Sequence, residues 1–481
     1  MVSNYMKVAF GVLCNQLMMG GAEAQAPQAK QSPNILFIQV DDLNYEYLGC
    51  FGSKIVKTPN VDQLAREGVM FQNAVAQGMM SGPSRNSLMT GLYPHNLGFY
   101  YNGDMRALPK GIWTFPQALQ RAGYYTSWVG KCHIRPAGKD RTAAMKKLMG
   151  FDFVQQTAGR VVLASKDEEV INPSTDWYMQ FLHEKGLLEH FKNEYPNIST
   201  LPDEAYLDGF FTHAALDFID QYKSPKPLFM WLNYSVPHGP YDVAAEYHKP
   251  YPQEIMPGAT ESDFVAPQGL IKKTKPNKSE AQAKQEQAGI SAAIAYMDAQ
   301  VGKVINQLKQ KGIYENTIIV FFSDQGVMLG DHNLHHKGTL YRQITNPALI
   351  ISYPKAYKMN QVNHSAVELT DLIGTVLEVA QAPKADQQQC KTTHSLVPVL
   401  TGKKEKVRDY AFGEVDGYVM VTDGKHRFIK GADAALLFDD VKDPKNLHDI
   451  SGQNPKVVLL LSNEIDQWLQ KTGPVLPRKS Y

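Results

Sequence analysis

The chain contains little cysteine and no excess of charge of either sign. Only four of its 481 residues are cysteine, and the formal net charge is +1. So few cysteines provide no disulfide framework for a chain of this length, and a hydrophobic core must therefore hold the fold together. Balanced charge argues against a nucleic-acid surface as the main partner, so an anionic substrate must be bound by a local cluster of cations.

Long apolar runs are also lacking beyond the first 26 residues, so no transmembrane segment is predicted. At the N-terminus, Lys7 precedes an apolar stretch from Val8 to Met19, and small-residue cleavage sites follow at Ala22, Ala24 and Ala26. We interpret residues 1–26 as a signal peptide and expect an exported, periplasmic protein. Cys14 leaves lipoprotein anchoring open, although the three residues before it form a poor lipobox. Removal of the signal peptide leaves Cys50, Cys132 and Cys390.

Apolar runs typical of buried strands alternate with helical patterns along the chain. Strands are predicted at 34–40, 124–129, 228–236, 317–322 and 348–352, and helices at 61–68, 115–122, 290–312 and 367–380. This alternation predicts an α/β fold with a large, mostly parallel sheet sandwiched by helices. Short strands at 410–412, 418–421 and 427–429 then predict a smaller antiparallel sheet, closed by a helix at 456–471. We therefore expect a main domain over 32–405 and a C-terminal subdomain over 406–481.

Two insertions interrupt the alternation, at 160–208 and 241–284. The second contains a lysine-rich run over 271–278. Such a run is usually a solvated loop, and it could instead help to hold a polyanion. We favour the solvated loop.

The segment from Ser81 to Arg85 reads Ser-Gly-Pro-Ser-Arg. A hydroxyl residue shortly before a proline is typical of a helix start, where unpaired backbone N–H groups and the helix dipole favour an anion. Arg85, about one turn further on, lies on the same face of that helix and adds a guanidinium group, which can donate two parallel hydrogen bonds to an anion. A simple capped turn explains Ser81 alone equally well, so the interpretation depends on what accompanies it.

Polar side chains follow each of the first four predicted strands, taken in chain order. They are Asp41 and Asp42; Lys131 and His133; His238; and Asp324 and Gln325, with Asp331 and Lys337 beyond. Ligands of open α/β sheets bind at the carboxyl ends of the strands, where these groups would meet. Any one of them has a structural explanation, such as a helix cap, but their coincidence indicates a site.

Four of these residues, Asp41, Asp42, Asp324 and Gln325, offer only oxygen ligands. Adjacent carboxylates repel one another unless a cation lies between them. Oxygen donors suit Ca²⁺ or Mg²⁺ better than Zn²⁺, and flexible geometry completed by a substrate oxygen favours Ca²⁺.

These residues resemble the motifs of the type I, formylglycine-dependent sulfatases of the alkaline phosphatase superfamily, in the serine-type branch similar to bacterial polysaccharide and glycosaminoglycan sulfatases. The first family signature matches over 80–91, and the second over 123–133. The segment 323–332 with Lys337 resembles the metal and sulfate segment, and 437–447 the C-terminal signature. Three positions depart from the pattern, namely Met79, Cys132 and Gln325, and the last still provides an oxygen ligand.

The resemblance implies the chemistry of the site. Ser81 would be oxidised to formylglycine (3-oxoalanine) by a serine-type maturase, and the hydrate of that aldehyde would attack sulfur. Asp41, Asp42, Ser81, Asp324 and Gln325 would bind Ca²⁺. Arg85 and Lys131 would hold the diol and the metal pocket. His133 would be the base that assists sulfate elimination, His238 the acid for the leaving alcohol, and Lys337 the ligand of the bridging oxygen. His95 and His332 are interpreted as structural or secondary.

A family resemblance says less about the substrate. We expect exolytic hydrolysis of O-sulfate esters on oligosaccharides, with a 2-O-sulfated uronate as the first candidate. The aromatic, amide and basic residues of the segment 99–106 suit a sugar with anionic groups, and ordinary loop packing explains them equally well. Two alternatives stay open: a phosphodiesterase or phosphonate hydrolase of the same superfamily, and a non-catalytic glycan-binding relative.

Overall fold

The computed structural model describes residues 32–104, 107–134, 141–159, 163, 176–277, 279–389 and 391–474. The predicted signal peptide, Cys14 and Cys390 lie outside these residues. Cys50 and Cys132 are free thiols. None of the described helices is both long and apolar enough to cross a lipid bilayer.

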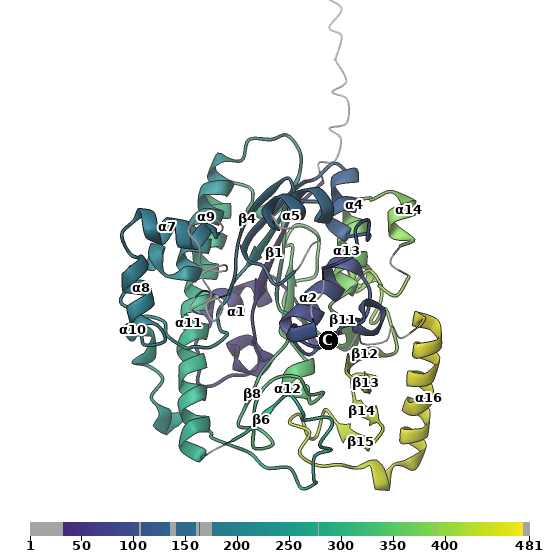
Figure 1. Ribbon diagram of the computed structural model, residues 1–481. Coiled ribbons are helices and arrows are strands. Elements are labelled where there is room, and N and C mark those ends of the chain that lie inside the picture. Colours follow the sequence, from purple (N-terminus) through teal and green to yellow (C-terminus); the bar gives the residue numbers. More distant parts are fainter. Residues whose placement is uncertain are drawn as a thin grey trace, which may run out of the picture. The chain divides into compact units, whose positions relative to one another are not determined.

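An eight-stranded sheet forms the centre of the fold, as predicted (Figure 1). Its order is β11-β2-β10-β7-β1-β5-β3-β4, and only β10 runs antiparallel to its neighbours. The strands are β1 (Asn34–Val40), β2 (Gly68–Val75), β3 (Tyr125–Lys131), β4 (Phe153–Thr157), β5 (Leu228–Asn233), β7 (Thr317–Ser323), β10 (Leu349–Ser352) and β11 (Gln361–Glu368).

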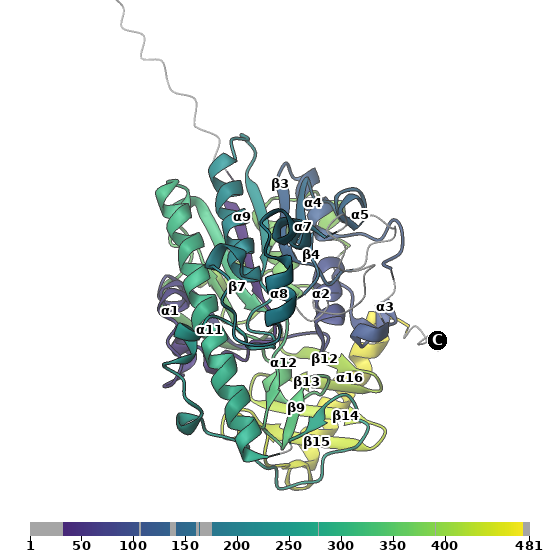
Figure 2. The same cartoon turned by 60° about the vertical axis from the view of Figure 1, so that its left-hand side comes forward.

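Helices cover both faces of this sheet because its central strands are apolar on both sides. In β1, Phe37 packs on one face and Ile38 on the other. The first face is covered by α2 (Ser81–Thr90), α4 (Phe115–Arg121) and α13 (Asp371–Val379), and the second by α1 (Pro59–Arg66), α9 (Leu207–Gln221) and α11 (Glu280–Gln310) (Figures 1 and 2). The shorter helices are α3 (Pro94–Leu97), α5 (Arg141–Met149), α7 (Trp177–Glu184), α8 (Leu188–Glu194), α10 (Ala245–His248), α12 (Arg342–Thr345), α14 (Lys384–Gln387) and α15 (Val397–Leu400).

A second, four-stranded antiparallel sheet follows near the C-terminus, also as predicted. It consists of β12 (Ala411–Val415), β13 (Tyr418–Thr422), β14 (His426–Gly431) and β15 (Ala434–Asp439). Helix α16 (Pro455–Thr472) packs against one face through Leu461, Ile465 and Trp468. The described residues from Ser32 onward form one compact unit, and the division at 405/406 within it stays a prediction.

Several predicted boundaries were wrong. The helix expected at 367–380 begins only at Asp371, because Val367 and Glu368 close strand β11. The strand expected at 228–236 ends at Asn233, and the helix expected at 290–312 begins ten residues earlier, where Ser279 caps it. Strands β2, β4, β11 and β15 were not predicted.

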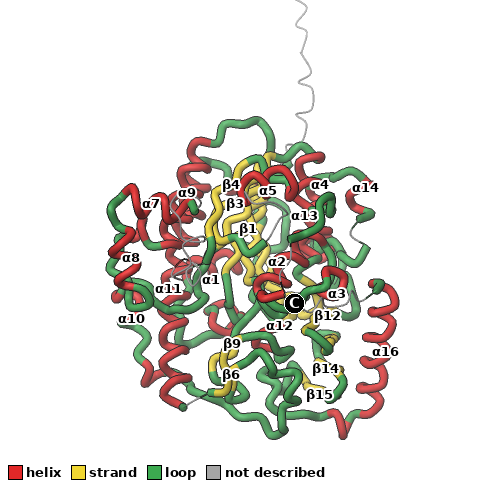
Figure 3. The backbone as a smooth tube through the Cα atoms, in the orientation of Figure 1, coloured by secondary structure: helices red, strands yellow, loops and turns green. Residues whose placement is uncertain are grey.

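A third, small sheet was not predicted either. It joins β6 (Lys275–Pro276), β9 (Leu334–His336) and β8 (Met328–Leu329), and strands β6 and β9 lie together below the main sheet in Figure 3. Strand β6 comes from the lysine-rich run, and β9 ends immediately before Lys337. This pairing fixes part of the second insertion beside the segment that carries a predicted site residue.

Candidate active site

Four adjacent strands bring the predicted residues to one edge of the main sheet. In the order β7-β1-β5-β3, the strand ends are followed by Asp324, Asp41, the His238 loop and His133. Close packing fixes this edge: a Cβ on Gly130, which has φ of +106°, would lie 2.1 Å from the carbonyl oxygen of Asn233. Only glycine allows strands β3 and β5 to approach in this way just before Lys131.

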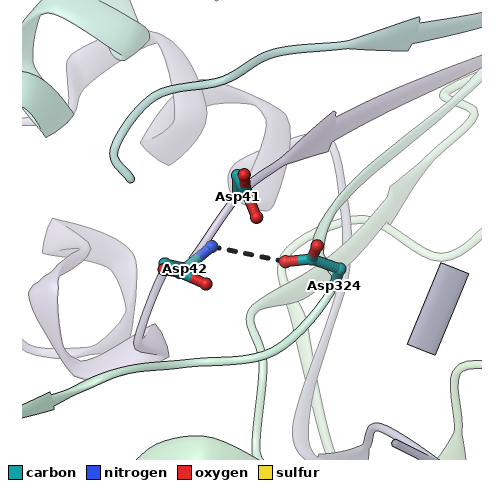
Figure 4. A group of neighbouring side chains, drawn as sticks. All are labelled: Asp41, Asp42 and Asp324. Carbon is teal, nitrogen blue, oxygen red and sulfur yellow. Dashed lines mark hydrogen bonds between the residues drawn. The ribbon is translucent and has the colours of Figure 1, made fainter. Parts of the chain in front are cut away.

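Three buried carboxylates form the centre of the site (Figure 4). One oxygen from each of Asp41, Asp42 and Asp324 lies within 4.8 Å of the others. The backbone N–H of Asp42 donates to Asp324 Oδ1 at 3.3 Å, the bond drawn in Figure 4. Asp42 has a φ of +64°, a left-handed conformation that Asp tolerates better than most residues. Local backbone strain therefore accompanies the cluster.

Ser81 lies against these carboxylates at the start of a helix. It is the first residue of α2, and its hydroxyl donates to Asp41 Oδ1 at 2.9 Å. The amide of Gln325 donates to Ser81 Oγ at 3.2 Å and also to Asp42. The helix-start prediction is thus confirmed, and the Ser81 hydroxyl is held between an acceptor, Asp41, and a donor, the Gln325 amide.

Arg85 contacts the same cluster from the next turn of α2. Its Nε donates to Asp324 Oδ2 at 2.8 Å, and its terminal nitrogen lies 3.6 Å from Asp41 Oδ1. Asn233 accepts a further bond at 3.1 Å, and the guanidinium is fully buried. Ser84 ties the helix to the same place by donating to the carbonyl of Asp324 at 2.7 Å.

Two lysines complete the charge balance. Lys131 pairs with Asp41, and Lys337 donates to both oxygens of Asp42 at 2.6 and 2.7 Å. Lys337 Nζ also lies 3.5 Å from Ser81 Oγ. Burial disfavours the ammonium, but Asp42 and its neighbouring carboxylates raise the pKa of Lys337 above its ordinary value, so it stays charged.

The two predicted catalytic histidines differ in their contacts. His238 Nδ1 lies 2.6 Å from the carbonyl of Gly239, which can only accept, so Nδ1 carries a proton and Nε2 faces Asp42 Oδ2 at 3.6 Å. His133 Nδ1 is buried and has no hydrogen-bond partner among the described residues. Burial lowers the pKa of both histidines, helped by Lys131 at His133 and by Lys337 at His238.

The pKa values of two of the carboxylates shift in opposite directions. Burial opposes ionisation of Asp41, but Lys131, His238 and Arg85 together hold its pKa well below the ordinary value. Burial and the charge of Asp41 raise the pKa of Asp324 to about 7. A further cation at the cluster would relieve this repulsion.

The residues fit a hard divalent cation. The three carboxylates each offer an oxygen ligand to one common point, and Gln325 Oε1 is a buried acceptor without a partner among the described residues. Turning the Gln325 amide would direct that oxygen toward the carboxylates. Ca²⁺ prefers such a set, whereas Zn²⁺ would recruit histidine or cysteine.

Three other polar residues near the motifs do not join the site. His95 Nδ1 bonds Glu414 Oε1 at 2.8 Å, and His332 Nε2 lies 2.9 Å from the carbonyl of Lys445. Asp331, which comes shortly after the fourth predicted strand, forms an ion pair with Lys445 at 2.8 Å. Both histidines thus bond to partners outside the carboxylate cluster, and their assignment as structural or secondary stays a prediction.

Sequence reasoning missed the positioning roles of three residues. Asn233 holds Arg85, and its place at the end of a buried apolar strand is the signal that could have found it. Asn102 accepts a 2.9 Å bond from the Gly82 N–H and so satisfies one donor at the start of α2. Asp208 accepts from the N–H groups of Ser235 and Val236 in the His238 loop, which no local pattern indicates.

Comparison with known proteins agrees with this geometry. The family model described as Sulfatase matches residues 33–382. An N-acetylglucosamine-6-O-sulfatase of Bacteroides thetaiotaomicron is 26% identical over 460 residues, covering 81% of this chain and 75% of that protein. Human iduronate 2-sulfatase is 29% identical over 367 residues, covering 71% of this chain and 64% of the human protein.

Among solved structures, a phosphonate monoester hydrolase of Agrobacterium radiobacter superposes with a TM-score of 0.75 at 19% identity, covering 92% of this chain and 96% of that one. Such a likeness shows a shared fold. Because the family model spans most of the chain, the chain belongs to the sulfatase family of the alkaline phosphatase superfamily, a family of sulfuric ester hydrolases.

Proposed function

We propose that this protein hydrolyses O-sulfate esters on carbohydrates, with a matured Ser81 as nucleophile and Ca²⁺ at the carboxylate cluster. The observation that carries the proposal is the position of Ser81 Oγ, 2.9 Å from Asp41 Oδ1 and 3.5 Å from Lys337 Nζ at the start of a helix. An unmodified serine is a weak nucleophile and would be left as a stable sulfate ester. Oxidation to formylglycine by a serine-type maturase would supply a hydrate that can eliminate sulfate and regenerate the aldehyde.

The charges support binding of a sulfate group. Asp41, Asp42 and Asp324 would hold Ca²⁺ together with Gln325 and the Ser81 side chain, and the ion would supply positive charge that polarises oxygen ligands. Arg85, Lys131 and Lys337 already balance the three carboxylates one for one. A divalent cation would therefore leave the site positive, as an anionic ester requires.

The histidines suit the two proton transfers that the reaction needs. Burial keeps His133 neutral, with Nδ1 free among the described residues to accept a proton during sulfate elimination. His238 carries one proton on Nδ1, and its Nε2 faces the site, where a second proton would pass to the leaving alcohol. Lys337 would hold the bridging oxygen of the sulfate ester.

The substrate is proposed as a sulfated saccharide, acted on exolytically, with a 2-O-sulfated uronate as the first candidate. Relatives named for glucosamine 6-O-sulfate and for iduronate 2-sulfate support the carbohydrate class and disagree on the position. We also propose export to the periplasm, with the signal peptide or a lipid at Cys14 as the route.

A single preparation tests the reaction. The protein is produced with a serine-type maturase, and the peptide that contains Ser81 is weighed; maturation predicts a mass about two units below that of serine. The same protein, with Ca²⁺, is screened on defined sulfated mono- and disaccharides for free sulfate. If the active protein contains only unmodified serine at this position, formylglycine is not the nucleophile. If the protein binds glycans but releases no sulfate, it is a non-catalytic relative.

The fold shared with a phosphonate monoester hydrolase makes phosphoryl chemistry the second candidate. The oxygen-only donor set of the described cluster argues against it. Comparing 4-nitrophenyl sulfate with an aryl phosphodiester and an aryl phosphonate monoester at equal enzyme concentration decides between them, because the proposal requires the sulfate to have the highest kcat/KM.

A further inference from the structure

The lysine-rich run is anchored beside the candidate active site. Strand β6 pairs with β9 through Lys275 opposite His335 and Pro276 opposite Leu334. The N–H of Asn277 donates to the carbonyl of Asn333 at 2.7 Å, which continues the pairing. Because β9 leads directly into Lys337, the backbone of this run is held at the rim of the site, although several of its side chains are exposed.

One lysine of the run reaches toward the helix that carries Ser81. A Cβ added to Gly338 would lie 2.8 Å from Lys273 Cβ and 3.0 Å from Met80 Cε, so both side chains pack on the residue after Lys337. Met80 immediately precedes Ser81. Gly338 has a φ of +95°, and its missing side chain provides the space that Lys273 crosses.

The ammonium group of Lys273 is held at a defined position. Its Nζ lies 4.7 Å from the centre of the Tyr101 ring, and that ring is buried. The next residue, Asn102, accepts the bond from the Gly82 N–H. Lys273 is thus fixed to the same short loop that caps the start of α2. A cation–π contact orients an ammonium group while leaving its N–H donors free for an anion.

Lys273 also differs from the other cations of the site in its charge balance. Arg85, Lys131 and Lys337 each contact a carboxylate of the cluster. Lys273 forms no salt bridge with any described residue, and its side chain is exposed. It is therefore a positive charge not balanced by a carboxylate among the described residues, and it lies beside the residues that flank Ser81 and Lys337.

We propose that Lys273, oriented by Tyr101, binds a second anionic group of the saccharide, a carboxylate or another sulfate, separate from the sulfate ester that is cleaved. The proposal rests on the function proposed above. It narrows the substrate class to saccharides that carry at least two anionic groups. Lys273 is then a specificity-determining residue, and it takes no part in the reaction at sulfur.

Binding to the Ser81→Ala protein tests the subsite independently of turnover. The probes are N-acetylglucosamine 6-sulfate, with one anionic group; glucosamine 2-N,6-O-disulfate, with a second sulfate; and glucuronic acid 2-sulfate, with a carboxylate. At least one two-anion probe should bind more tightly than the one-anion probe. Adding Lys273→Gln should raise the Kd of that two-anion probe about five- to tenfold and reduce the salt dependence of its binding. The Kd of the one-anion probe should change less than twofold.

Two matched variants separate charge from loop structure. Lys273→Arg keeps the charge and should restore binding to within about twofold. Lys272→Gln removes the neighbouring exposed charge and should leave the Kd of both kinds of probe unchanged. The subsite is contradicted if no two-anion probe binds more tightly than the one-anion probe, or if Lys273→Gln weakens both classes equally.

Sulfate release by the matured protein is measured in parallel, so that the two proposals fail separately. Absence of release from every probe counts against the proposed function and leaves the binding comparison intact. Release without any loss of the two-anion preference in Lys273→Gln counts against the subsite alone.

Discussion

The hydroxyl of Ser81 donates a 2.9 Å hydrogen bond to Asp41 across forty residues of sequence. Ser81 begins helix α2 and Asp41 directly follows strand β1, so this contact joins the start of α2 to the carboxylate cluster. The proposed nucleophile, the proposed cation ligands and the lysines that balance their charge thereby lie together in one buried position. The predictions that follow treat these roles separately.

Removing the Ser81 hydroxyl should abolish turnover without unfolding the protein. We expect Ser81→Ala to lower kcat for 4-nitrophenyl sulfate at least about 10³-fold, because the remaining binding groups cannot replace a nucleophile. Ser87 provides a matched control on the same helix, since its Oγ is buried without a partner among the described residues. Ser87→Ala should retain activity and change the unfolding free energy by less than about 1 kcal/mol. Equal losses in both variants would contradict the assignment.

Calcium should stabilise the folded protein. After treatment with EDTA, adding Ca²⁺ to about 100 times its Kd should raise Tm by about 3–5 °C, because an ion that binds only the folded state shifts the equilibrium. Asp324→Asn should remove this shift. Asp331→Asn, which breaks an ion pair with Lys445 outside the cluster, should lower Tm and keep the calcium response. Differential scanning fluorimetry measures all three proteins, and a calcium response that survives in Asp324→Asn would contradict the site.

The parts of the fold that could be predicted are those whose buried residues form apolar runs along the sequence. Strands β1, β5 and β7 are continuous apolar runs, and the residues that follow them could be placed at one sheet edge from topology alone. Strand β11 was missed because its first half is exposed and polar, so it shows no apolar run. Strand β2 was missed because Gln72 and Asn73 interrupt its apolar residues.

The clustering of Asp41, Asp42 and Asp324 could be predicted because carboxylates that follow neighbouring parallel strands meet at one edge of the sheet. Their role as cation ligands stays a prediction. Residues that act through a single distant contact could not be predicted. Asn102 meets the Gly82 N–H, and Lys273 meets Tyr101, only because the loops fold back on α2. Lysine-rich loops are usually solvated, and the pairing of β6 with β9 that makes this one different depends on tertiary structure.

Replacing His238 should matter most for substrates with poor leaving groups. We expect His238→Gln to lower kcat/KM about 10²–10⁴-fold for a sugar sulfate, whose alcohol needs a proton, and much less for 4-nitrophenyl sulfate, whose phenolate leaves without one. Burial and Lys337 lower the pKa of His238 below 6.5 in the free protein. The protonated acid is therefore lost as pH rises through that lowered pKa, and kcat/KM of the wild type should fall on the alkaline side. A sugar-sulfate profile unchanged in His238→Gln would contradict the acid role.

Glu368 should make stability depend on pH in the opposite sense from an ordinary carboxylate. It is buried, and burial together with the charge of Asp371 raises its pKa to about 7, although Arg408 opposes the shift. The unfolded chain releases this proton near pH 4.5 and the folded protein near pH 7. The contribution is therefore complete below about pH 4.5 and is lost as pH rises to about 7. Urea unfolding at pH 5 and pH 8 should show that Glu368→Gln loses less stability over this interval than the wild type.

Asp208 should act as a positioning residue for His238. Its Oδ1 accepts from the N–H groups of Ser235 and Val236, so it fixes the loop that leads to the histidine. We expect Asp208→Ala to cost about 2–3 kcal/mol of stability and to lower kcat for sugar sulfates about tenfold more than for 4-nitrophenyl sulfate. Asp208→Asn keeps an oxygen acceptor and should recover most of that selectivity.

A second buried carboxylate distinguishes positioning from general destabilisation. Asp298 accepts from the N–H groups of Val61 and Asn60 at 2.8 and 3.1 Å, at the start of α1 and away from the His238 loop. Asp298→Ala should cost a similar amount of stability, because it removes the same kind of bond. Its folded fraction should nevertheless retain the wild-type ratio of activities on the two substrates. If Asp298→Ala changes that ratio as much as Asp208→Ala does, loss of stability alone explains both variants, and the connection from Asp208 to the proton on His238 is refuted.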